Sequence, residues 1–196
     1  MTTHDPQQAD TPKRRRSRGP AIAVTLIAAT LAVSTGLYWF QPWKLWQDKT
    51  VREELAVPTA PPETAPPSPG ASRPPAPPEP KTLAAGELIS HEHRTTGTVK
   101  VVRLPDGSRT LRLEGLDTSN GPDLQVWITD APVKEGRKGW SVFDDGAYES
   151  LGKLKGNKGD QNYALPAGID LDKFTSVSIW CARFSVSFGA AELAPA

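Results

Sequence analysis

The sequence predicts an all-β C-terminal domain, a small antiparallel β-sandwich or barrel, preceded by one transmembrane helix and a proline-rich linker. Three observations predict this architecture. Residues 21–40 carry no charge, eleven of the 23 residues from 58 to 80 are proline, and short apolar runs beyond residue 83 alternate with Gly, Pro, Asn and Asp. We therefore divide the chain into a basic tail (1–18), a transmembrane helix (19–40), a linker (41–82) and a β domain (83–196).

The apolar run is long enough to cross a bilayer. Twenty helical residues span about 30 Å, the thickness of a hydrocarbon core. Five lysines and arginines lie at positions 13–18, before the run. The positive-inside rule then places the N-terminus in the cytoplasm and the C-terminal domain outside, in a bacterial cell envelope. A cleaved secretory signal is the alternative, but it favours a shorter apolar region that ends in a small-residue cleavage site. We predict a single-pass anchor in the cell membrane.

The proline-rich stretch predicts an extended spacer. Proline fixes φ and lacks an amide donor, so residues 58–80 are expected to form neither helix nor sheet. Such a stretch reaches at most about 70 Å, at about 3.1 Å per residue. It would hold the C-terminal domain away from the membrane.

The β domain is predicted from period-two alternation. Leu111 and Leu113 alternate with Arg112 and Glu114, as in a half-buried strand. The last predicted strand is long, with Val177, Ile179 and Cys181 on one face. The strands are expected at residues 98–104, 110–116, 123–129, 146–154, 161–165 and 177–188.

Charge and motifs exclude several function classes. The β domain has thirteen Lys/Arg against fifteen Asp/Glu, which argues against nucleic acid as a partner. The sequence has no Ser-His-Asp arrangement, paired-carboxylate signature or phosphate-cradling glycine loop, so an ordinary hydrolase or transferase is not indicated. The chain is an enzyme only if it has a redox role.

Cys181 is the only cysteine, so it cannot form a disulfide within its own chain. It is either a small buried apolar residue, a reactive thiol, or the attachment point for another molecule. The chain lacks C-x-x-C and C-x-x-C-H, and its only methionine is Met1, which excludes a copper site with a methionine ligand. His91 and His93 would share one face of a strand. Metal binding by this pair with Cys181 has weak support, and two surface histidines are the alternative.

Two polar segments have structural explanations. Residues 120–123 (Asn-Gly-Pro-Asp) are typical of a turn before a strand, and we expect the Asp123 carboxylate to cap it. Lys153, Lys155 and Lys158 are expected to form a solvated strand edge. The loop at 156–163 is a polar strand entry of the kind that also lines binding sites.

Four ordered segments resemble the DM-thirteen domain, a small extracytoplasmic module. The resemblance implies a role in electron transfer through its cysteine, acting as a bare thiol or holding a prosthetic group such as haem. It implies that Cys181 is the candidate redox thiol and that Cys181 and His93 are the candidate cofactor-binding residues. The candidate partners are the membrane and a redox protein. No metal site is predicted, and haem or metal as cofactor has weak support. The alternative is a non-catalytic envelope module that binds a ligand or partner, with Cys181 in its core. The segments lie at residues 93–97, 119–124, 151–163 and 177–189.

Overall fold

The computed structural model describes residues 19–55 and 79–196. The chain divides into two compact units, residues 1–40 and 41–196. The predicted basic tail and nearly all of the proline-rich stretch lie outside the described residues.

The first unit contains helix α1, Gly19–Phe40. The described apolar side chains of α1 are exposed, for example Val24 and Leu31. The segment Ile22–Lys44 is long and apolar enough to cross a membrane, and an N-terminal signal sequence shares these properties.

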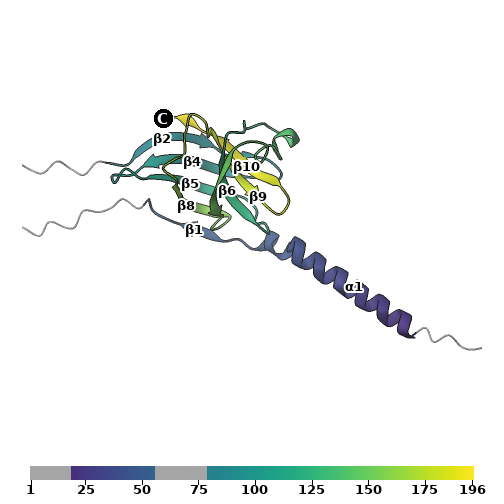
Figure 1. The fold of residues 1–196 in the computed structure, drawn as a ribbon. Coiled ribbons are helices and arrows are strands. Elements are labelled where there is room, and N and C mark those ends of the chain that lie inside the picture. The colour runs from purple at the N-terminus through teal and green to yellow at the C-terminus, as the bar shows by residue number, and fades with distance from the viewer. Residues whose placement is uncertain (1–18, 56–78) are drawn as a thin grey trace, which may run out of the picture. The chain divides into compact units, whose positions relative to one another are not determined.

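The second unit confirms the predicted all-β fold. Its described residues form a six-stranded sheet in the order β1-β8-β5-β4-β2-β11 and a five-stranded sheet in the order β3-β10-β9-β6-β7 (Figure 1). All strand pairs are antiparallel except β1 with β8. The strands are β1 Thr50–Arg52, β2 Lys81–Glu87, β3 Ile89–Ser90, β4 Thr96–Arg103, β5 Arg109–Asp117, β6 Leu124–Thr129, β7 Tyr148–Lys153, β8 Lys158–Leu165, β9 Ser176–Cys181, β10 Val186–Glu192 and β11 Ala194–Pro195, and the short 3-10 helices are η1 Pro42–Trp46 and η2 Arg137–Gly139.

The core lies between the two sheets and follows the predicted alternation. Leu111 and Leu113 on β5 are fully buried and pack in one cluster with Val126 and Ile179 of the other sheet. The pairing of β5 with β8 shifts between Leu113 and Leu116, where Gly115 has a φ of 58°. This bulge returns Leu116 to the core, although a regular strand would turn it outward.

A second, smaller cluster covers the outer face of the five-stranded sheet. Trp127 and Trp180 stack at 4.9 Å between ring centroids, and Phe143 from the connection between β6 and β7 packs on Trp180. Strand β9 is therefore buried on both faces, with Ile179 and Cys181 inside and Trp180 outside.

The predicted single strand at 177–188 is wrong, because it is a hairpin. Strand β9 ends at Cys181, a four-residue turn follows, and β10 begins at Val186 and returns antiparallel to β9. Ser185 closes the turn with a φ of 49°. Trp180 and Phe188 therefore belong to two strands and point to opposite faces of the sheet.

Part of the predicted linker forms a strand of the folded unit. Strand β1 pairs in parallel with β8, and the Glu53 N–H donates to the Asp160 carbonyl at 3.0 Å. Gly159 permits this approach, because a Cβ there would lie 2.0 Å from the Val51 carbonyl oxygen. Lys155 and Lys158, expected at a solvated edge, instead form ion pairs with Glu53 and Asp48 of this segment.

Candidate functional site

The four segments singled out in the sequence meet at one end of the sandwich. Thr95 Oγ1 lies 2.9 Å from the Phe188 carbonyl oxygen and 2.8 Å from Oγ1 of Thr118, the residue before the second segment, and Ser119 Oγ of that segment lies 2.6 Å from His93 Nδ1. Asn157 Nδ2 donates to the Thr118 carbonyl at 2.8 Å. Hydrogen bonds thus join segments that are as far as 93 residues apart in the chain.

Cys181 lies within this end of the sandwich, at the last position of β9. It pairs with Leu124 on β6 and Val186 on β10, and its exposed fraction is zero. The turn beyond it is fixed by two backbone hydrogen bonds, from Ala182 N–H to the Asp123 carbonyl at 3.0 Å and from Phe184 N–H to the Cys181 carbonyl at 3.2 Å. The Cys181 side chain belongs to the inner core cluster.

Burial raises the pKa of the Cys181 thiol above its ordinary value. Backbone N–H groups of Phe184, Arg183 and Asp123 hydrogen-bond to the sulfur and act in the opposite direction, while the charge of Asp123 adds to the increase in pKa. The thiol is therefore protonated at neutral pH in the closed domain. Because the thiolate is the nucleophile, the closed form is unreactive.

His93 lies at the same end of the sandwich without contacting the sulfur through a hydrogen bond. Its Nδ1 is 2.6 Å from Ser119 Oγ, and its ring packs on Phe188 with 3.9 Å between centroids. Phe188 belongs to the core cluster that contains Cys181. Burial lowers the pKa of His93, with Glu92 acting in the opposite direction.

His91 and His93 do not form the predicted pair. The chain bends directly after β3, so these residues are not in a strand. His91 Nε2 donates to the Lys134 carbonyl at 3.1 Å, and its Nδ1 lies 2.8 Å from Ser187 Oγ. Its ring packs on Phe143 of the outer cluster, whereas His93 packs on Phe188 of the inner one.

The residues around Cys181 do not fit a haem or a metal ion. Cys181 has no exposed surface and lies between paired strands on both sides, so its sulfur has no open coordination position. Among residues 19–55 and 79–196, no three His, Cys, Asp or Glu side chains are grouped to hold a metal. The chemistry available at this site in the closed domain is that of a thiol.

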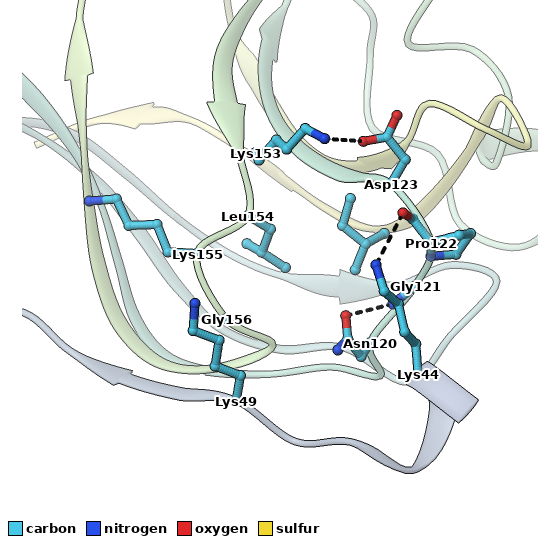
Figure 2. A pocket seen from close by; sticks show the side chains of 11 residues that line it. Lys44, Lys49, Asn120, Gly121, Pro122, Asp123, Lys153, Leu154, Lys155 and Gly156 are labelled. Atoms are coloured by element: carbon cyan, nitrogen blue, oxygen red, sulfur yellow. Dashed lines mark hydrogen bonds and ion pairs between the residues drawn. The ribbon is translucent and has the colours of Figure 1, made fainter. Parts of the chain in front are cut away.

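A lysine-lined pocket of about 170 Å³ lies beside this site (Figure 2). Lys44 and Lys49 line it from the segment that includes η1, and Lys153 and Lys155 line it from the end of β7 and the loop after it. The sequence analysis missed this pocket, because its lysines are up to 111 positions apart in the chain. The polar loop at 156–163, which the sequence marked as a candidate lining, contributes Gly156.

The expected role of Asp123 as a turn cap is wrong. The Asn120 side chain fills that role, because its Oδ1 accepts from the Gly121 N–H at 2.9 Å. Asp123 Oδ1 is buried, lies 3.6 Å from Lys153 Nζ, and has no hydrogen-bond partner within the described part of the chain. Asp123 lines the pocket with its carboxylate toward Lys153 (Figure 2), and its backbone carbonyl accepts from the Ala182 N–H next to Cys181.

Comparison with known families gives one match. The family model described as "Electron transfer DM13" matches residues 87–193, more than half of the chain. No curated protein and no solved structure matches the chain.

Proposed function

Because the chain belongs to the Electron transfer DM13 family, we propose that it is a membrane-tethered electron-transfer domain in which the Cys181 thiol is the redox group. The observation that carries this proposal is the arrangement around the sulfur. The family match covers four segments that meet at the end of the sandwich where the chain's single thiol lies, and backbone N–H groups next to the thiol oppose the increase in its pKa. Such N–H groups stabilise a negative charge on sulfur when the thiol loses its proton.

A lone thiol reacts through a second molecule. The partner in this proposal is a protein that carries a disulfide. Cys181 loses its proton, its thiolate attacks one partner sulfur, and a new S–S bond forms as the partner's S–S bond breaks. The partner's other sulfur leaves as a thiolate and takes up a proton. The product is a mixed disulfide between Cys181 and the partner.

The reaction requires the hairpin turn to open. In this proposal the segment that opens is the turn at 182–185, which follows Cys181 directly and is held by the backbone hydrogen bonds of Ala182 and Phe184. Opening this turn leaves the strands of the core paired, so it costs less free energy than global unfolding. The electron-transfer form is thus a locally opened state of the domain.

The redox state of Cys181 in native membranes tests the proposal. Cells are quenched in acid, free thiols are blocked, and disulfides are then reduced and given a mass tag. We expect a tagged fraction in the wild type that disappears when a reductant is added before quenching, and no tag in Cys181→Ser. A thiol that is entirely free under oxidising and reducing growth conditions would contradict the proposal.

The tether and its orientation are part of the proposal. Helix α1 has the length and composition of a membrane span, and the basic residues lie before it. The Cys181 domain is then extracytoplasmic. Protease added to intact cells should cut within residues 58–80 and release the domain. Protection of this stretch until the membrane is broken would contradict the orientation.

A second candidate function is supported by the burial of Cys181. Its zero exposure and its packing in the inner cluster suit an envelope module that binds a ligand or partner, with Cys181 as a core residue. In that case Cys181→Ser changes stability but no redox property. The thiol-trapping experiment distinguishes the two functions.

A further inference from the structure

The pocket beside Cys181 gathers positive charge from two distant parts of the chain. Four lysines and one aspartate contribute to its lining. Figure 2 shows Lys44 and Lys49 reaching into the view from the lower segment, Lys153 extending toward Asp123, and Lys155 pointing away. Like charges brought together repel one another, so a pocket of this kind is stabilised by an anion.

The ammonium groups differ in how they are already bound. Lys155 Nζ forms an ion pair with Glu53 Oε2 at 2.8 Å and donates a hydrogen bond to the Asn162 carbonyl at 2.7 Å. Lys44 Nζ donates to the Pro122 carbonyl at 3.3 Å, which leaves two of its three N–H groups for a ligand. The Lys49 side chain is exposed and has no ion pair or hydrogen bond within residues 19–55 and 79–196. Lys44 and Lys49 are therefore the available cations.

Asp123 contributes the one negative charge of the lining. Its Oδ1 has almost no exposed surface and lies 3.6 Å from Lys153 Nζ, so this oxygen is paired with Lys153 and a ligand in the pocket does not reach it. The requirement for a ligand therefore comes from Lys44 and Lys49, and it is an anionic group.

We propose that this pocket binds a phosphoester, with Lys44 and Lys49 on the phosphate. The volume of about 170 Å³ is below the roughly 300–1,000 Å³ of pockets for drug-sized ligands, which favours a headgroup-sized ligand. Lysine binds phosphate as a point charge and needs no fixed geometry. This inference stands apart from the redox role of Cys181.

Two sources can supply this chemistry, a glycerophospholipid headgroup and a free phosphoester. The lipid source is supported by the position of Lys44, four residues after the end of α1 at Phe40. Chain length alone keeps the two Cα atoms within about 14 Å of each other. If α1 spans a membrane, chain length therefore keeps Lys44 within reach of phospholipid phosphates.

Calorimetric titration of the full-length protein in phosphatidylcholine nanodiscs, with glycerol 1-phosphate as the probe, tests the proposal. We expect saturable binding that weakens about tenfold or more in Lys44→Gln/Lys49→Gln, because both charged contacts to the phosphate are lost. Lys44→Arg/Lys49→Arg keeps the charge and should retain binding. Lys134→Gln/Lys138→Gln removes the same charge from exposed positions at and near η2 and is the matched control.

Replacing part of the phosphatidylcholine with phosphatidylglycerol distinguishes the sources. Loss of probe binding in these nanodiscs assigns the pocket to the lipid headgroup, and unchanged binding assigns it to a free phosphoester. The proposal is overturned if the wild type shows no saturable binding. It is equally overturned if the control pair weakens binding as much as the Lys44 and Lys49 pair. These results do not involve the thiol, so they leave the redox proposal to its own test.

Discussion

Asp123 borders two regions of opposite character. On one side its backbone carbonyl accepts from the Ala182 N–H, next to Cys181 of the closed, apolar core, and on the other the same residue lines an open pocket with four lysines. Ile179 in the first region is fully buried, whereas the Lys153 side chain in the second is 82% exposed. The closed region contributes to stability through burial, and the open one is available for binding.

The largest expected effect separates these regions by stability. Ile179→Ala removes buried apolar volume and should lower the free energy of unfolding by about 2–5 kcal/mol. Lys153→Ala should change it by no more than about 0.5 kcal/mol, since exposed ion pairs contribute little. Chemical denaturation of residues 41–196, a fragment that retains β1, measures both values. If both substitutions lowered the free energy of unfolding equally, Lys153 of the pocket would contribute as much to stability as Ile179 of the core.

A smaller effect is expected from the thiol itself. Cys181→Ala should cost about 1–2 kcal/mol near neutral pH, because it leaves a small cavity. The folded-state pKa of Cys181 is raised, so above the ordinary thiol pKa of about 8.5 the unfolded chain loses this proton first. Wild-type stability then falls with rising pH more steeply than that of Cys181→Ala. The difference between the two proteins should therefore shrink between about pH 8 and pH 10.

Denaturation of both proteins across this pH range measures the difference. A constant or growing gap would show that the native thiol is not held in its neutral form. Lysines and tyrosines titrate at similar pH, but they are common to both proteins. The comparison therefore reports on Cys181 alone.

The sequence predicted the strands that alternate regularly and missed those without such a signal. Strand β5 was predicted from Leu111 and Leu113, and β6 from Val126 and Ile128, because one face of each packs in the core. The hairpin after Cys181 was missed because residues 182–185, Ala-Arg-Phe-Ser, contain none of the usual turn residues Gly, Pro, Asn and Asp. Strand β1 was missed because three residues carry no periodicity and the partner strand is over 100 residues away.

The candidate site was predictable as a set of segments but not as a geometry. Cys181 was identified as the only cysteine, and the four family segments were found in order. The burial of Cys181 depends on the packing of β9 and β10 in the inner cluster, and the turn at 182–185 that separates these strands was not predicted. The separation of His91 from His93 depends on a bend after β3 that replaces the predicted strand. The pocket depends on tertiary contacts of Lys44 and Lys49 with distant loops.

The most direct test of the redox proposal is the rate at which iodoacetamide alkylates Cys181 in the native, full-length protein. This rate is compared with hydrogen exchange at the amide of Ile179, which lies between paired strands on both sides. If the turn at 182–185 opens locally, alkylation reports a larger open population than the Ile179 amide does, and its rate increases as pH rises toward the thiol pKa. An alkylation rate that implies the same open population as global unfolding would contradict the account, and Cys181 would then be a core residue of a binding module.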